Sequence, residues 1–293
     1  MSNTDLIIEQ RSRDIGDFLV GRYIPFSKKR MVGPFAFIDH MGPSTIGPTK
    51  YIDVNQHPHI GLSTLTYLLE GEIMHADSIG TVQKISPGSV NWMNAGSGVV
   101  HTERTPDELR NGTTFTMNGY QIWVALPKDK EDMTPSFHHI AANELPQWED
   151  KSASFKLIAG EGFGRTSPVP VHSHLFMIEI KTTEAYELKI NGQLKGEIGV
   201  LVEKGSIQAC EHHVEQGNML ISKINDNCSL TIGTNSHLFL FGGTPFLEER
   251  FIDWNFVSHN RVKIDQAIEK WKSKKFPHVP NDTSYIPYPP KRF

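Results

Sequence analysis

The chain has 293 residues, of which 38% are hydrophobic and 21% charged, a composition typical of a globular protein long enough for two domains. Its formal net charge of −4 would not attract nucleic acid, so we expect no direct nucleic-acid binding. The first residues lack a charged segment followed by an apolar one, and no apolar run nears membrane-spanning length. We therefore expect neither a signal peptide nor a membrane association.

The chain contains two cysteines, Cys210 and Cys228. Two are too few for a disulfide framework, and neither has a second thiol at metal-ligand spacing. We expect both to be plain buried or semi-buried thiols. This usage fits a reducing compartment, so the sequence favours a cytoplasmic location.

Strand-like segments begin early in the chain. Residues 6–9, 18–20 and 35–39 are rich in strand formers, and the last of these is expected to enter a first β-barrel. His40 follows that segment directly. We expect it to pack at the strand end rather than to approach a metal cavity.

Two short motifs bracket the stretch from residue 51 to residue 104. They are His57-Pro58-His59 and His101-Thr102-Glu103. In a strand, side chains at i and i+2 point to the same face, so each motif can aim two donors at one point. Pro58 argues against a helix interior, where the same spacing would also splay the donors apart.

The segment between the two motifs is predicted to consist of short strands and tight turns. Residues 62–69 and 90–93 resemble strands, whereas 77–80, 87–88 and 95–98 resemble turns. Turn signals every eight to twelve residues or so indicate a β-sandwich or barrel, in which the first and last strands can lie side by side. The motifs could then form a site of three imidazoles and one carboxylate. Because a histidine on a strand is usually a surface or core residue, spacing alone leaves both interpretations open.

The second half of the chain repeats the strand-and-turn pattern. Residues 117–126 are expected to form a strand, and 127–150 a loop that contains the domain boundary, with His138 and His139 on the surface. His172-Ser173-His174 has the spacing of a ligand pair, but no His-x-Glu motif follows it. We therefore expect a second barrel without a metal.

The C-terminal segment changes character. Its apolar residues recur at helical spacing and predict an amphipathic helix that docks on a barrel. These residues are Val262, Ile264, Ala267, Ile268 and Trp271. Ser258 or Asn260 is the candidate N-cap, and the proline-rich tail 277–293 is expected to lie extended along the surface.

Several of these motifs together resemble the pirin family, and the resemblance spans nearly the whole chain. The motifs are His57-Pro58-His59, Tyr67-Leu68-Leu69-Glu70-Gly71, Pro87-Gly88, Trp92-Met93, Ala95-Gly96, Val100-His101-Thr102-Glu103, Met31-Val32-Gly33-Pro34-Phe35, Asp39-His40-Met41-Gly42-Pro43, Gly160-Glu161-Gly162 and Trp254-Asn255-Phe256-Val257-Ser258.

The resemblance implies an all-β bicupin: two tandem jelly-roll-like cupin barrels and a C-terminal α-helix. We expect one barrel in residues 1–135 and a metal-free one in 136–293, which also holds the helix and tail. The family binds one metal, usually iron, in the N-terminal barrel. Its ligands fall here on His57, His59, His101 and Glu103.

The sequence departs from the family pattern just after the first histidine pair. Pirins commonly follow His-Pro-His with Arg-Gly and a Glu three residues after the Arg, whereas this chain has Ile60, Gly61 and Ser63. The fourth ligand is then expected to be Glu103. The missing Arg and Glu could alter the polarity at the cavity mouth.

Two functions follow from the resemblance. Some members open the ring of flavonols with dioxygen, and others act as iron-dependent co-regulators of transcription. The first hypothesis is a quercetin 2,3-dioxygenase-type enzyme acting on a small aromatic, flavonol-like substrate, with Glu103 as ligand, general base or both. The alternative is a non-catalytic, redox-sensing co-regulator that binds a protein partner. We expect Fe(II), although Zn, Mn, Ni, Co or Cu also suit such ligands.

Overall fold

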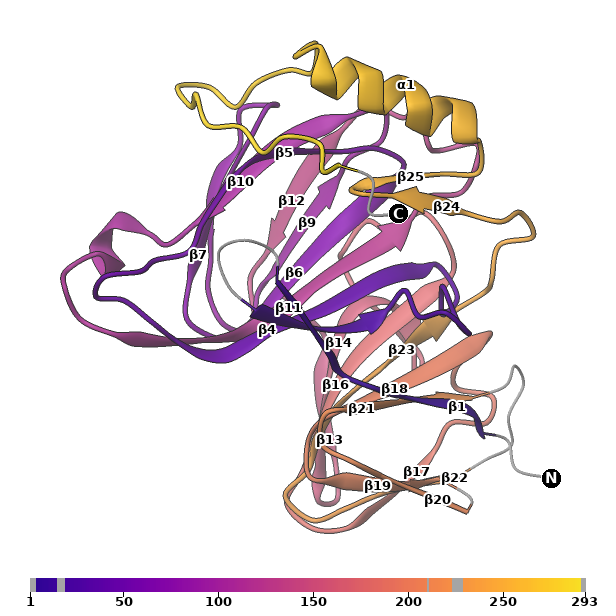
Figure 1. The fold of residues 1–293 in the computed structure, drawn as a ribbon. Helices are drawn as coiled ribbons and strands as arrows, with labels where there is room; N and C mark the ends of the chain where they lie inside the picture. Colours follow the sequence, from indigo (N-terminus) through magenta and orange to yellow (C-terminus); the bar gives the residue numbers. More distant parts are fainter. Residues whose placement is uncertain (1–3, 15–18, 210, 223–228, 291–293) are drawn as a thin grey trace. The chain divides into compact units, whose positions relative to one another are not determined.

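The computed structural model describes residues 4–14, 19–209, 211–222 and 229–290. Strands are the main element of their fold, which has one α-helix, near the C-terminus (Figure 1). The all-β prediction with a C-terminal helix is therefore confirmed. Cys210 and Cys228, expected to be buried thiols, lie outside the described residues.

The chain divides into two compact units, each assembled from segments that are not continuous in sequence. The unit that we call the histidine unit comprises Arg13–Val20, Asp39–His139 and Leu247–Phe293. The other, the apolar unit, comprises Met1–Ser12, Gly21–Ile38 and Ile140–Phe246. The predicted boundary between a first barrel in residues 1–135 and a second in 136–293 stays a prediction.

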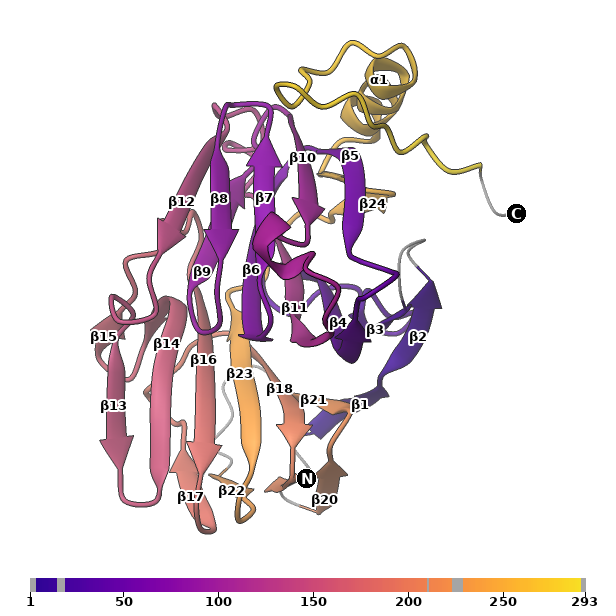
Figure 2. The ribbon, with the colours of Figure 1, turned by 90° about the vertical axis from the view of Figure 1, so that its left-hand side faces the viewer.

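Two facing sheets build the histidine unit. One has the strand order β5-β10-β7-β8, and these four strands lie side by side in Figure 2. The other has the order β12-β9-β6-β11-β4. The bounds are β4 Phe35–Ile46, β5 Asp53–His59, β6 Leu62–Glu70, β7 Ile73–Asp77, β8 Val82–Ile85, β9 Val90–Asn94, β10 Val99–Arg104, 3-10 helix η1 Asp107–Leu109, β11 Phe115–Ala125, β12 Ser136–Ile140, β24 Phe251–Asp253, β25 Phe256–Ser258 and α1 Arg261–Lys272.

The apolar unit also contains two sheets, with strand orders β1-β21-β18-β23-β16-β14-β13 and β17-β22-β19-β20. Alternate residues of these strands bury one continuous apolar core, as the period of two in a strand requires. The bounds are β1 Thr4–Glu9, β13 Gln147–Asp150, β14 Ala153–Gly162, β15 Arg165–Thr166, β16 Leu175–Thr182, β17 Tyr186–Lys189, β18 Glu197–Lys204, β19 Ser206–Ala209, β20 His212–Glu215, β21 Asn218–Ser222, β22 Ser229–Ile232 and β23 His237–Gly243; β2 Arg11–Asp14 and β3 Leu19–Ile24 follow β1 in the chain.

The segment 127–150 differs from its prediction. It was expected to be a loop, but it contains strands β12 and β13. The strand signal of β12 is weak, because only its last residue, Ile140, is buried, and His138 and His139 before it are exposed, as expected. β13 pairs with the next strand, β14, across a two-residue turn at Lys151 and Ser152, so hairpin pairing rather than its own composition forms that strand.

Helix α1 follows its prediction closely. The Asn260 side chain caps it by accepting from Val262 N at 3.0 Å. Its buried face packs with Ile60, Val100 and Phe256. That face consists of Ile264, Ala267, Ile268 and Trp271. Val262, predicted to belong to it, is 58% exposed. No helix in the described part of the chain is long and apolar enough to cross a membrane.

The C-terminal segment runs along the edge of β5, as Figure 1 shows for the yellow chain that follows α1. Ile286 N donates to the Gln56 carbonyl at 3.0 Å, and Gln56 N donates to Ser284 Oγ at 3.2 Å. The Gln56 amide donates to the carbonyls of Asp282 and Ser284, and its oxygen accepts from Val279 N. The tail therefore covers an edge strand that would otherwise expose unpaired backbone groups.

Candidate metal centre

Strands β5 and β10 carry the two histidine motifs and pair antiparallel. His57 lies directly opposite His101, and His59 lies opposite Val99. Pro58, which cannot donate a ladder hydrogen bond, is tolerated because β5 is the edge strand of its sheet. The pairing therefore brings the three histidines of the two motifs together, as predicted.

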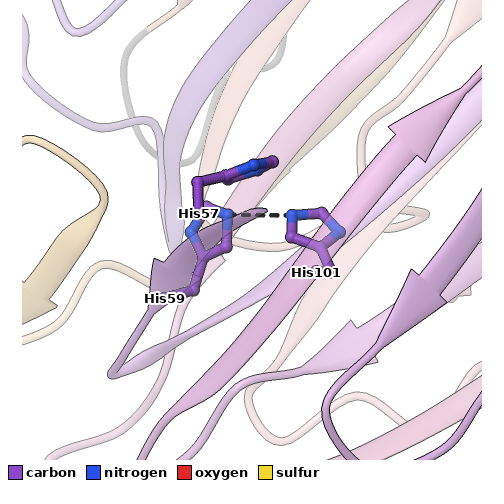
Figure 3. A group of neighbouring side chains, drawn as sticks. All are labelled: His57, His59 and His101. Carbon is purple, nitrogen blue, oxygen red and sulfur yellow. Dashed lines mark hydrogen bonds between the residues drawn. The ribbon is translucent and has the colours of Figure 1, made fainter. Parts of the chain in front are cut away.

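The imidazoles of His57, His59 and His101 converge on one point, as Figure 3 shows. Each offers a ring nitrogen, and these three atoms all lie within 4.8 Å of one another. The Nε2 atoms of His59 and His101 are 3.1 Å apart. Two nitrogens bound at about 2.1 Å and at a right angle to one ion lie about 3.0 Å apart, so the spacing suits metal ligation.

All three histidines are buried, and their exposed fractions are 8%, 2% and 1% in chain order. Burial lowers the pKa of His57 to about 4, because charging the ring there is costly. Burial, followed by the neighbouring histidines, lowers the pKa of His59 and His101 well below the ordinary range. The rings are therefore neutral near pH 7, the form that binds a metal.

One of these rings has its tautomer set by the backbone. His57 Nδ1 lies 2.8 Å from the Asn55 carbonyl, which can only accept. Nδ1 therefore carries the proton, and Nε2 is left with the lone pair that a metal requires. A carbonyl partner of this kind is usual behind metal-binding histidines.

Glu103, the fourth predicted ligand, lies on the same strand as His101, and a bulge between them shifts the pairing with β5. It is partly buried and does not belong to the three-histidine group at the spacing given above. Burial raises the pKa of Glu103 from 4.5 to about 7, and a hydrogen bond with Thr66 opposes this rise. Its ligand role stays a prediction.

Sequence reasoning missed two residues beside this group, His75 and Asp77 on β7. They lie opposite Glu103 and His101, respectively, in the β7–β10 ladder. His75 Nδ1 is 3.2 Å from His101 Nδ1, and His75 Nε2 is 3.0 Å from Asp77 Oδ2. Their i, i+2 spacing on a strand is the same signal that identified the other two motifs.

The residues that depart from the pirin pattern do not join the histidine cluster. Ile60 is 9% exposed and packs with α1 residues, including Trp271. Ser63 is fully buried, and by strand alternation it faces the side of β6 opposite to Thr66, which contacts Glu103. The expected change in polarity at the cavity mouth stays a prediction.

His40 packs as predicted. It is 6% exposed, stacks on Tyr120 with ring centroids 4.7 Å apart, and its Nε2 lies 2.7 Å from Asn118 Oδ1. In the apolar unit, His174 is exposed and its Nδ1 lies 3.4 Å from Thr244 Oγ1.

The fold and the site define a bicupin, two tandem cupin domains with a buried histidine cluster in one of them. Comparison with known protein families identifies the family to which this chain belongs. The pirin family model matches residues 17–124, and the model of the pirin C-terminal cupin domain matches residues 176–277. A pirin-like protein of Caulobacter vibrioides is 41% identical, over 97% of this chain and 99% of that protein. The chain belongs to the pirin family, which confirms the resemblance.

Solved structures support the same fold. The crystal structure of quercetin 2,3-dioxygenase from Acinetobacter baumannii is 33% identical, with a TM-score of 0.89 over 98% of this chain and 95% of that one. A bacterial pirin from Escherichia coli in complex with nickel(II) is 17% identical, with a TM-score of 0.64 over 82% of this chain and 99% of that one. At that identity the second likeness shows the fold alone.

Proposed function

We propose that this protein is a metal-dependent oxidoreductase of the quercetin 2,3-dioxygenase type. Its site would hold one divalent ion, Fe(II) in our assignment, on His57, His59, His101 and Glu103. The observation that carries this proposal is the convergence of three buried, neutral imidazoles within 4.8 Å. The relative from Acinetobacter baumannii, named a quercetin 2,3-dioxygenase and 33% identical, supports the reaction class.

The donor set fits such an ion. Histidine and carboxylate ligands with further positions open are typical of non-haem iron and related sites. When bound, the ion supplies a Lewis-acid centre that increases the acidity of a substrate hydroxyl. The three histidines contribute neutral donors, and Glu103 would contribute the negative charge.

Glu103 is also suited to move the substrate proton. A carboxyl with a pKa of about 7 is an efficient general base near neutral pH. It would accept the proton of a flavonol-like hydroxyl, while its hydrogen bond with Thr66 holds the carboxyl in place. Thr66 Oγ1 also lies 3.1 Å from the Gln121 side-chain amide, so the threonine is fixed from a second side.

Aromatic side chains flank the histidines. The Trp123 ring lies edge-on to His59 at a centroid distance of 5.3 Å, and Phe137 stacks on His75 at 4.6 Å. Such apolar rings beside the site would favour an aromatic substrate over a polar one. A small, oxygen-bearing aromatic is therefore the substrate class that we propose.

The test is oxygen uptake with quercetin under air, by protein loaded separately with Fe, Mn, Co, Ni or Cu. We expect oxygen consumption and loss of the flavonol absorbance with at least Fe(II), and neither with His101→Gln. Absence of turnover with every metal would contradict the enzyme assignment. Metal binding without turnover would favour the non-catalytic co-regulator.

A further inference from the structure

A line of buried polar side chains extends from His101 away from the point where the three histidines converge. It runs from His101 through His75 to Asp77, and we call it the Asp77–His75–His101 chain. The three residues are 1%, 5% and 0% exposed. Hydrogen bonds between groups buried this far from solvent are strong, and each proton in them must have a defined position.

The orientation of Asp77 is set by the turn that it begins. Its Oδ1 accepts from Ile79 N at 3.0 Å and from Thr81 N at 2.9 Å. Gly80 completes the turn with a φ of +94°, a conformation that favours glycine. These bonds direct the other oxygen, Oδ2, toward His75 Nε2 at 3.0 Å.

The proton positions follow from this orientation. An ionised carboxylate only accepts, so His75 Nε2 must donate to Asp77. A neutral His75 then has a lone pair on Nδ1, which faces His101 Nδ1 at 3.2 Å. His101 must therefore carry its proton on Nδ1, and its Nε2 retains the lone pair.

His75 does not serve as a fourth ligand in this arrangement. It contacts Nδ1 of His101, whereas Nε2 of His101 faces His59 at 3.1 Å. The two nitrogens of one imidazole point in divergent directions, so an ion at Nε2 lies away from His75. His75 is instead placed behind the ligand.

We propose that Asp77 and His75 are positioning residues that hold His101 in the tautomer whose Nε2 can ligate a metal. This proposal rests on the metal site proposed above. The chain sets one ligand's lone pair before any ion arrives, and it limits rotation of that ring. Residues with this role typically change metal affinity by about 10–100-fold when replaced.

Asp77→Asn is the decisive variant, because the turn determines how the new amide must sit. Asn Oδ1 would keep accepting from Ile79 and Thr81, so its NH2 group would face His75 Nε2. His75 would then accept there and donate from Nδ1, which forces His101 to carry its proton on Nε2. The variant should fold, yet its ligand nitrogen would be blocked.

The matched control is Glu179→Gln in the apolar unit. Glu179 is 4% exposed, and its carboxylate lies 2.9 Å from His237 Nε2, so the control also replaces a buried histidine-paired carboxylate. A double variant, Asp77→Asn with His75→Phe, tests the route. When His75 is already replaced by Phe, adding Asp77→Asn should cause little further loss of metal affinity.

Two readouts are needed. The first is the ¹⁵N chemical shifts of the His101 ring in metal-free protein, which identify the protonated nitrogen. The second is the affinity for Fe(II) and Ni(II), measured by competition with a chromophoric chelator. We expect wild type and Glu179→Gln to carry the His101 proton on Nδ1, and Asp77→Asn to carry it on Nε2 with about 10–100-fold weaker binding.

The proposal would be overturned by a wild-type His101 proton on Nε2, or by an unchanged tautomer in Asp77→Asn. If the two replacements lowered metal affinity additively in the double variant, Asp77 would not act on His101 through His75, and the proposal would equally be overturned. A wild-type protein that binds no divalent metal contradicts the proposed function instead. The tautomer measurement on metal-free protein still decides the hydrogen-bonded chain in that case.

Discussion

His59 and His101 lie 42 positions apart in the chain, yet their Nε2 atoms are 3.1 Å apart in the buried interior of the histidine unit. Pairing of β5 with β10 produces this proximity, and the covered edge of β5 supports it. Several consequences for stability and metal binding can be measured.

Replacing Glu103 by Gln should change stability and metal affinity in opposite directions. The folded pKa of about 7 lies above the ordinary value of 4.5, so the folded state binds more protons between these values and loses stability as pH rises through them. At pH 8 the metal-free variant should be more stable by about 1–3 kcal/mol in urea unfolding. Its affinity for divalent metal should fall at least about tenfold.

The exposed Glu187 on β17 offers a matched control for that change. Glu187→Gln should alter neither quantity. If Glu103→Gln kept the wild-type metal affinity, Glu103 would have no place among the ligands.

The metal-free protein should lose stability as pH falls below about 6.5. His57, His59 and His101 have folded pKa values below the ordinary 6.5, so the unfolded state binds more protons in that window. These three groups outnumber Glu103, which acts in the opposite sense. The free energy of unfolding should decrease by on the order of 2 kcal/mol per pH unit between pH 6 and 5.

Thermal melts of metal-free protein from pH 7.5 to 5 check this dependence. A variant with Gln at all three histidine positions should have a clearly shallower slope. Equal slopes for the two proteins would mean that these histidines are not the groups responsible.

Removing the Gln56 side chain should release the C-terminal segment from β5. Gln56→Ala breaks bonds to Val279, Asp282 and Ser284 at a position that is 1% exposed. We expect a loss of about 2–4 kcal/mol in stability and faster proteolysis after α1. Metal affinity should weaken a few-fold, because the neighbouring His57 loses support.

Gln83→Ala is the comparison for that loss, since the Gln83 amide donates to the carbonyl of the adjacent Lys84. It should cost well under 1 kcal/mol. A Gln56 variant that unfolds and is cleaved like wild type would show that the tail does not support β5.

Much of this arrangement could be predicted from the sequence. His57-Pro58-His59 and His101-Thr102-Glu103 carry a strand-spaced donor pattern, and the apolar repeat in α1 predicts its buried face. Both patterns are local and periodic, so they can be recognised without knowledge of the fold. The pirin motifs then specified the family.

Other features depend on which distant segments meet. β1 pairs with β21, and the C-terminal tail covers β5, although nothing local in either segment indicates its partner. His75 could have been found from its spacing to Asp77. Its contact with His101 could not, because that requires the β7–β10 register.

The most direct test of the central claim is an anomalous-difference map at the iron K edge, from crystals of Fe(II)-loaded protein grown without oxygen. We expect one strong peak within about 2.0–2.3 Å of a nitrogen of His57, His59 and His101 and of a carboxylate oxygen of Glu103. A peak elsewhere, or no peak in fully loaded protein, would contradict the account.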